Sequence, residues 1–233
     1  MGGDLTIRRS GGGLTGLGGL DGLASVGGDL ELSDSTALVD LSGLGGLTSL
    51  GGRLVITGHA ALEDLAGLGG LSTVTGLEIT DDDALERLDG LGLTEVDGDV
   101  LVARNEALRS LDGLDTLATV TGSVTLDNND ALVDLDGLRG LPEVAGSFTL
   151  STNDALADLD GLDALTTVGG SLVIELQDTL SDVTGLYGVT SIGADLTLRD
   201  NHCLPLSAAE ALRDEVDQVG GTTTVTGNSG PCE

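Results

Sequence analysis

Residues 117–141 read LATVTGSVTLDNNDALVDLDGLRGL, and this stretch sets the pattern for almost the whole chain. Its general form is L-x-x-V-x-G-x-V-x-L-x-x-N-x-x-L-x-x-L-x-G-L-x-x-L, and successive copies begin 23 to 25 residues apart. A repeat of about 20 to 50 residues is typical of a solenoid, in which each copy packs only against its neighbours. The 233 residues therefore predict one elongated repeat domain.

Each copy carries two apolar residues separated by one outward-facing residue, which is the alternation of a short β-strand. A glycine usually precedes the pair and indicates a bend into the strand. The pairs are Leu5/Ile7, Leu30/Leu32, Leu54/Ile56, Leu77/Ile79, Val100/Val102, Val124/Leu126, Phe148/Leu150, Leu172/Ile174 and Leu196/Leu198, with a degenerate tenth copy at Thr223/Val225. Because each coil returns the chain in the same direction, we expect these strands to be parallel.

Leucines follow each strand at every third residue, as at Leu156, Leu159, Leu162 and Leu165. A period of three fits neither a helix of 3.6 residues per turn nor an uninterrupted strand. It fits a chain that winds around a narrow interior, with one leucine of each short facet pointing inward. The pattern predicts a mainly β fold, a leucine-rich β-solenoid of about nine coils over residues 1–202.

A polar residue stands three positions before the first leucine of each coil. Short polar side chains can bond backbone groups that a tight corner leaves unpaired. We therefore expect a hydrogen-bonded corner ladder, and we assign His59 to it as a corner residue in preference to a ligand or catalyst. The ladder comprises Ser35, His59, Asp82, Asn105, Asn129, Asn153, Gln177 and Asn201.

The repeat breaks after Asn201, and residues 203–233 are predicted to cap the last coil. Ser207 and Glu210 have the spacing of a capping box, which predicts a helix at about 207–218. A final strand is expected at about 222–226. Cys203 and Cys232 are the only cysteines and bracket this segment, so we expect a disulfide and an oxidising compartment, with two buried free thiols as the alternative.

The composition restricts the function classes. With 39 acidic residues against nine basic ones, the formal net charge is −30, which opposes binding to nucleic acid or anionic lipid. No apolar run approaches the roughly 18 residues of a membrane span, and MGGDLTIRRS lacks the apolar region of a signal peptide. The motifs of zinc proteases, P-loop enzymes and nucleophile-elbow hydrolases are absent, so we do not expect an enzyme.

Three segments carry a family resemblance: GSVTLDNNDALVDLDGL (122–138), GSFTLSTNDALADLDGL (146–162) and GADLTLRDNHCL (193–204). They resemble the receptor L-domain family, leucine-rich β-helices of insulin-receptor-type ectodomains, and the closing NHCLP…GNSGPC resembles bacterial surface-protein members. The resemblance implies a right-handed parallel β-solenoid at the cell surface or outside the cell. The cysteine-rich modules and partner-binding aromatic residues of the receptors are missing, and a shared fold does not imply one ligand.

Acidic residues also recur at fixed positions of the coil. One row is Asp112, Asp136 and Asp160, and a second is Asp134, Asp158 and Asp182. Like charges on neighbouring coils should repel by about 1 kcal/mol per pair before salt screening. We interpret these rows as a solvated acidic face. The alternative is a Ca²⁺ site, since corner carboxylates and carbonyls are suitable ligands, although no EF-hand loop or calcium-binding nonapeptide is present.

The sequence predicts a non-catalytic extracellular structural or recognition module with an acidic, repetitive surface. Its partner is expected to be a protein or glycan at a cell surface, and the first coil, which no helix precedes, is a candidate for end-to-end self-association. The first alternative is a calcium- or salt-dependent adhesin or surface-layer component. Two others are an ice-binding protein, from the outward threonine rows, and a carbohydrate-active enzyme that uses surface carboxylates.

Overall fold

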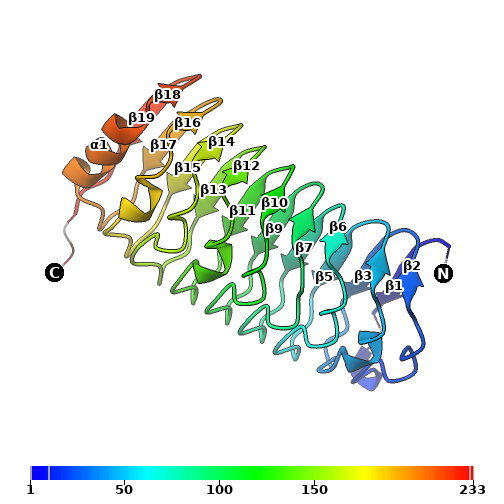
Figure 1. Cartoon of the computed structure of the whole chain (residues 1–233). Helices are drawn as coiled ribbons and strands as arrows, with labels where there is room; N and C mark the ends of the chain where they lie inside the picture. The colour runs from blue at the N-terminus through cyan, green and yellow to red at the C-terminus, as the bar shows by residue number, and fades with distance from the viewer. Residues whose placement is uncertain (1, 10, 231, 233) are drawn as a thin grey trace.

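The computed structural model describes residues 2–9, 11–230 and 232, and it is a parallel β-solenoid (Figure 1). Its main sheet has ten strands in the order in which the chain makes them. They are β1 (Leu5–Arg8), β3 (Leu30–Ser33), β5 (Leu54–Thr57), β7 (Leu77–Thr80), β9 (Val100–Ala103), β11 (Val124–Asp127), β13 (Phe148–Ser151), β15 (Leu172–Glu175), β17 (Leu196–Arg199) and β19 (Thr223–Thr226). The predicted strand pairs are thus confirmed, including the degenerate last copy.

The main sheet is in strict register from coil to coil. Val124 pairs with Phe148 and Phe148 with Leu172, so equivalent repeat positions form straight rows across the sheet. The inward rows are fully buried from β3 to β17, and the one phenylalanine, Phe148, is the largest side chain among them. Stacked aliphatic rows therefore fill the interior, as the near absence of aromatic residues requires.

A second, narrower sheet closes the coil on another side, and the sequence reading did not predict it. Its seven strands are β6 (Thr73–Val74), β8 (Glu95–Val96), β10 (Thr119–Val120), β12 (Glu143–Val144), β14 (Thr167–Val168), β16 (Ser191–Ile192) and β18 (Gln218–Val219). The short pair β2 (Ser25–Val26) and β4 (Ser49–Leu50) continues this side toward the first coil. Each strand exposes or half-buries its first residue and buries its second, except that Val219 of β18 is half-buried.

The leucine rows form the remaining side, where the chain turns through short 3-10 segments. These are η1 (Gly11–Gly13), η2 (Ser42–Leu44), η3 (Asp136–Leu138) and η4 (Thr184–Leu186). Here coils approach so closely that a Cβ atom on Gly137 would lie 2.1 Å from the carbonyl oxygen of Leu111. The recurring D-G-L and T-G-L triplets therefore keep glycine where the preceding coil leaves no room for a side chain.

One helix, α1 (Leu206–Glu215), covers the last coil and contacts β19 (Figure 1). It begins one residue earlier and ends three residues sooner than predicted. Pro205, with φ −61° and ψ 136°, is its N-cap and no side chain bonds there, so the expected Ser207 capping box is wrong. The helix stops because Val216 is extended and turns its side chain toward the core.

Candidate functional site

The eight predicted ladder residues form one column at the corner after the main sheet, and all are completely buried. From His59 onward, each backbone N–H donates to the side-chain oxygen of the next ladder residue, at N···O distances of 2.8 to 3.2 Å. Such a hydrogen bond contributes about 1 kcal/mol to the free energy of unfolding, and a buried amide without a partner lowers stability by more than that. The column therefore connects each coil to the next through the interior from the coil of His59 to that of Asn228.

The ladder extends one residue further than the sequence suggested, to Asn228. This side chain accepts from the backbone N–H of Asn201 at 3.2 Å and donates to the carbonyl of Leu198 at 2.8 Å. Its spacing of 27 residues from Asn201, longer than the others, hid it because α1 is inserted between the two coils. The signal that could have found it is the T-G-N triplet directly after the tenth strand.

The residue before each ladder position takes the left-handed backbone conformation that turns the corner. Gly58 and Gly227 adopt it at φ of 77° and 70°. Elsewhere non-glycine residues do so at φ between 46° and 58°, which is unfavourable for residues with a Cβ. Before the ladder residues they are Asp34, Asp81, Arg104, Asn128, Thr152, Leu176 and Asp200, and Arg9 after the first strand adopts the same conformation. From His59 onward, the buried bonds of the ladder hold this strained corner in place.

A second ladder, which the sequence reading missed, runs along the start of the main-sheet strands. Asp99 accepts from the N–H of Ser123 at 2.7 Å, and Ser123, Ser147 and Ser171 each accept from the next coil at 3.0 to 3.2 Å. Asp195 then accepts from the N–H and hydroxyl of Thr222, and these bonds hold its pKa below the ordinary value. The recurring polar residue after the bend glycine is the sequence signal for it.

The second acidic row has a structural role beyond its charge. Asp134 accepts from the N–H of Asp136 at 3.2 Å, Asp158 from that of Asp160 at 3.1 Å, and Asp182 from that of Thr184 at 2.8 Å. These are Asx turns, in which the carboxylate substitutes for a backbone acceptor. At the equivalent position Ser110 Oγ accepts from the N–H of Asp112 at 3.1 Å. The aspartates of this row therefore close turns in addition to carrying charge at the surface.

The first acidic row faces solvent on successive coils. Asp158 is the main cause that raises the pKa of Asp160 above its ordinary value, with Asp163, Asp182 and Asp136 adding to it. Asp136 itself pairs with Arg139 on its own coil. Within the described residues, no group of three or more His, Cys, Asp and Glu side chains is placed to hold a metal ion. The six candidate Ca²⁺ ligands thus lie in two parallel rows and do not form one coordination shell.

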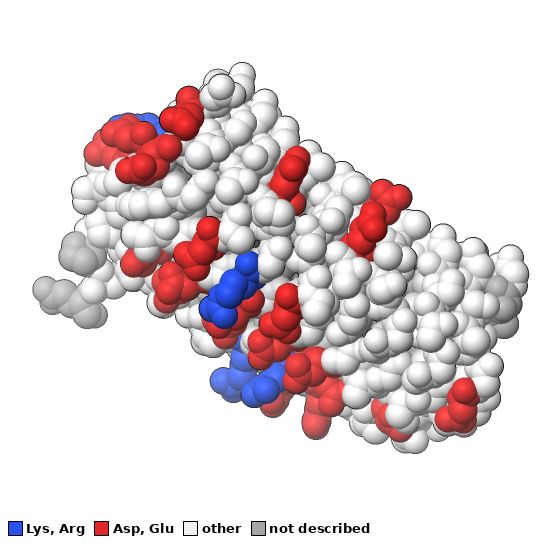
Figure 2. Space-filling model, viewed as in Figure 1, with Lys and Arg blue, Asp and Glu red and all other residues white. Residues whose placement is uncertain are grey.

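Arginines are placed where they neutralise acids between coils on the main sheet. Arg53 pairs with Glu78 and Arg199 with Glu175, both at 2.7 Å, and Arg8 pairs with Glu31. Past Glu78 this outward row is uncharged at Leu101, Thr125, Thr149 and Val173, which are aligned strand by strand and half-buried. We call this stretch the central patch. Figure 2, which shows one side of the molecule, likewise has acidic clusters separated by broad uncharged areas.

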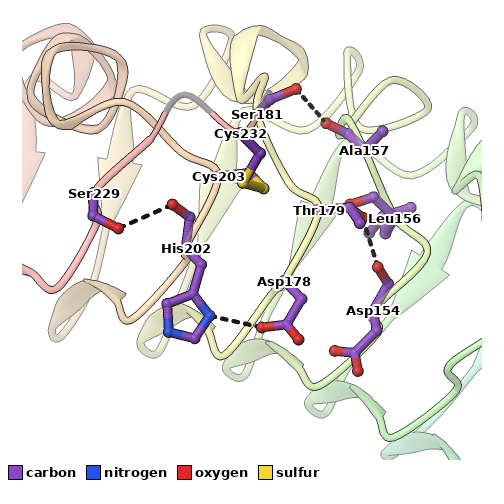
Figure 3. The surroundings of a disulfide bond; sticks show 10 residues. All are labelled: Asp154, Leu156, Ala157, Asp178, Thr179, Ser181, His202, Cys203, Ser229 and Cys232. Carbon is purple, nitrogen blue, oxygen red and sulfur yellow. Dashed lines mark hydrogen bonds and ion pairs between the residues drawn. A yellow bond between two sulfur atoms is a disulfide. The ribbon is translucent and has the colours of Figure 1, made fainter.

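The capped end is tied by a disulfide between Cys203 and Cys232, whose Cα atoms are 4.9 Å apart (Figure 3). Around it, His202 Nδ1 lies 2.7 Å from Asp178 Oδ1, and the Ser229 hydroxyl donates to the His202 carbonyl at 3.1 Å. His202 is exposed, whereas His59 is buried in the ladder. The two histidines therefore serve different coils and form no joint site.

Protein-family models, curated protein sequences and solved structures were each compared with the chain, and none of them matches. In the part of the chain that the structure describes, no helix is both long and apolar enough to cross a membrane.

Proposed function

We propose that the protein is a non-catalytic structural or recognition module of the extracellular space or cell surface, related to the receptor L-domain family. The observation that carries the proposal is the main sheet, where ten strands in register present straight rows of side chains along the molecule. Three of the acids on its outward face, Glu31, Glu78 and Glu175, are paired with arginines. The Cys203–Cys232 disulfide supports an oxidising compartment, since such bonds persist mainly outside the cytosol.

The central patch is the surface best suited to a partner in this proposal. Its four residues are uncharged in a protein of net charge −30, so a protein or glycan that contacts only this row buries no carboxylate of the row. Asp127, two residues after Thr125 on the same face, lies at the edge of the patch. Its threonines offer hydroxyl groups at the inter-strand spacing of about 4.8 Å. A rigid, repetitive polar surface of this kind suits a partner that is itself repetitive.

Binding to glycan and peptide arrays tests this assignment, with one substitution on each sheet. Thr149→Arg places a long charged side chain in the centre of the patch, and Thr167→Arg does the same on β14 of the narrow sheet. We expect Thr149→Arg to abolish binding and Thr167→Arg to leave it intact. Turnover of a glycan by the wild-type chain, or loss of binding only with Thr167→Arg, contradicts the proposal.

A calcium- or salt-dependent adhesin is the second candidate, and the raised pKa of Asp160 favours it. A bound or screening cation would reduce the repulsion between Asp160 and the neighbouring carboxylates that raise its pKa. Melting temperature in millimolar Ca²⁺ should exceed that in Mg²⁺ at equal ionic strength if the rows bind calcium. Equal melting temperatures in the two salts leave only screening, which is the result we expect.

End-to-end self-association through the first coil remains part of the proposal. Strand β1 pairs with β3 on one side, and Ile7 and Leu14 border an open apolar hollow that continues through residues 16–20. Residues 1–30 carry three acids and two arginines, a net charge of −1, so two such ends repel little. Light scattering should show concentration-dependent mass that Ile7→Asp removes and Val225→Asp, at the opposite end, retains. A strictly monomeric wild-type chain contradicts it.

A further inference from the structure

One step of the corner ladder differs chemically from all those that follow it. Between Asn105 and Asn228 the ladder is made of amides, but the step from His59 to Asp82 joins an imidazole to a carboxyl group. Asp82 Oδ1 accepts from the backbone N–H of His59 at 2.8 Å and lies 2.9 Å from its Nδ1. Both side chains are completely buried.

The amide steps show what a complete ladder residue does. Asn105 donates from Nδ2 to Asn129 Oδ1 and to the carbonyl of Ile79, both at 3.1 Å. Asn129 donates in the same way to Val102, and Asn201 to Ile174, each at 3.0 Å. Asn105, Asn129 and Asn201 thus each use the amide oxygen to accept from a backbone N–H of the preceding coil and the NH₂ group to donate to a strand carbonyl of that coil. Gln177 instead donates to the carbonyl of Glu175 on its own coil.

Asp82 has the acceptor half of this arrangement and lacks the donor half. Its Oδ1 occupies the role of the amide oxygen, so Oδ2 occupies the role of the amide nitrogen. Oδ2 is buried and has no hydrogen-bond partner among the described atoms, and the same is true of His59 Nε2. The strand carbonyl equivalent to that of Ile79 belongs to Ile56, because these two residues pair in register.

We infer that Asp82 is a neutral carboxylic acid in the folded protein, whose Oδ2–H donates to the carbonyl of Ile56. A protonated carboxyl group has one acceptor oxygen and one donor, which is the pattern of an asparagine amide. The ladder is complete while Asp82 carries this proton. Loss of the proton leaves a buried negative charge beside a carbonyl oxygen. The joint between the coils of β5 and β7, meaning the ladder hydrogen bonds that connect them, then weakens.

The surroundings of Asp82 agree with this assignment. Burial raises its pKa above the ordinary value, while the hydrogen bonds and charge of His59 act in the opposite direction. Asp81, next in the chain, also raises it, and Asp81 is half-exposed and paired with Arg104 at 2.8 Å. On the far side lies Asn105, whose Oδ1 accepts the backbone N–H of Asp82, and it is uncharged.

The direction of the pH dependence follows from this raised pKa. The folded state holds the proton more tightly than the unfolded chain, whose aspartate titrates near pH 3.9. The stabilisation from protonated Asp82 is therefore fully present below about pH 3.9 and is lost as pH rises through the folded pKa. This group therefore makes the folded state more stable in mild acid than at pH values above its folded pKa.

Asp82→Asn separates this account from a simple buried ion pair. The asparagine supplies the missing donor permanently, so the unfolding equilibrium constant at pH 7 should fall about tenfold for each unit by which the pKa is raised. Near pH 4 the variant and the wild type should have nearly equal unfolding constants. If His59 and Asp82 instead form an ion pair, Asp82→Asn makes the protein less stable at pH 7, which overturns the inference.

Asn129→Asp is the matched control, since Asn129 is equally buried in the amide part of the same ladder. It should create the same pH dependence there, with near wild-type stability at pH 4 and lower stability at pH 7. A ¹³C NMR titration of the Asp82 carboxyl carbon gives a readout that does not depend on unfolding. A signal that titrates with the exposed aspartates, or an Asp82→Asn variant no more stable than wild type at pH 7, contradicts the inference.

Discussion

The two ends of the solenoid solve the same problem in opposite ways. At the C-terminal end, α1 buries Ala209 and Leu212 over the last coil, and the Cys203–Cys232 disulfide fixes the segment that follows. At the other end, Leu5, Ile7, Leu14 and Leu20 pack against the core but remain partly exposed. A solenoid is stabilised by nearest-neighbour contacts, so an end coil without a cap lacks half of them. Stability should therefore decrease from the capped end to the open end.

Loss of the disulfide should have the largest effect on stability. It should make the capped end nearly as unstable as the open end. The bond closes a loop with a sequence separation of 29, which corresponds to about 3.5 kcal/mol in the chain-entropy model. Cys203→Ser/Cys232→Ser should lower the free energy of unfolding by that order in urea titrations. Reduction of the wild type with dithiothreitol is the control and should match the double variant. An unchanged midpoint in both would remove the disulfide from the account of the cap.

The same truncation at each end should have unequal effects. Leu212→Ala deletes a completely buried side chain of the cap and should cost about 3 kcal/mol. Leu20→Ala deletes a partly exposed leucine of the first coil and should cost about 1 kcal/mol. Denaturation followed by circular dichroism measures both. Equal losses would mean that the first coil is packed as tightly as the last.

Salt should have the smallest effect on stability. It should act on the central coils, which carry the acidic rows. Added NaCl screens the exposed acidic rows over about 10 Å at 0.1 M, so the melting temperature should rise with ionic strength. Asp160→Asn should reduce this salt dependence, because the neighbouring carboxylates disfavour its charge. Asp158→Ala should instead destabilise at every salt concentration, since it removes the bond to the N–H of Asp160. A melting temperature that is independent of salt contradicts the stacking of these rows.

Much of the fold followed from the sequence because the coil length is nearly constant. A strict repeat places chemically equivalent residues on top of one another, so the main-sheet strands, the buried leucines and the corner ladder could all be predicted from spacing alone. The disulfide could also be expected, since Cys203 and Cys232 bracket the one segment that departs from the repeat. Periodicity thus carried long-range information that is usually absent from a single sequence.

The features that were missed are short or serve two roles. Strands of two residues, such as Thr119–Val120, are too short for an alternating pattern, although a polar residue followed by Val, Ile or Leu recurs at each of them. The ladder through Ser123 and Ser147 consists of residues that also suit exposed bends. Asp134 and Asp158 were interpreted by charge, whereas their hydrogen bonds close turns. The role of each of these residues depends on local backbone geometry, which the residue type alone does not specify.

Native-state hydrogen exchange of the ladder amides tests the central claim most directly. The backbone N–H groups of His59, Asp82, Asn105, Asn129, Asn153, Gln177 and Asn201 donate to the next coil along one column and are all buried. Their opening free energies can therefore be compared as reporters of successive joints. We predict the lowest values at His59 and Asp82 and a rise toward Asn201. Uniform values along the column, or the lowest value at Asn201, would contradict a solenoid that is anchored at its capped end.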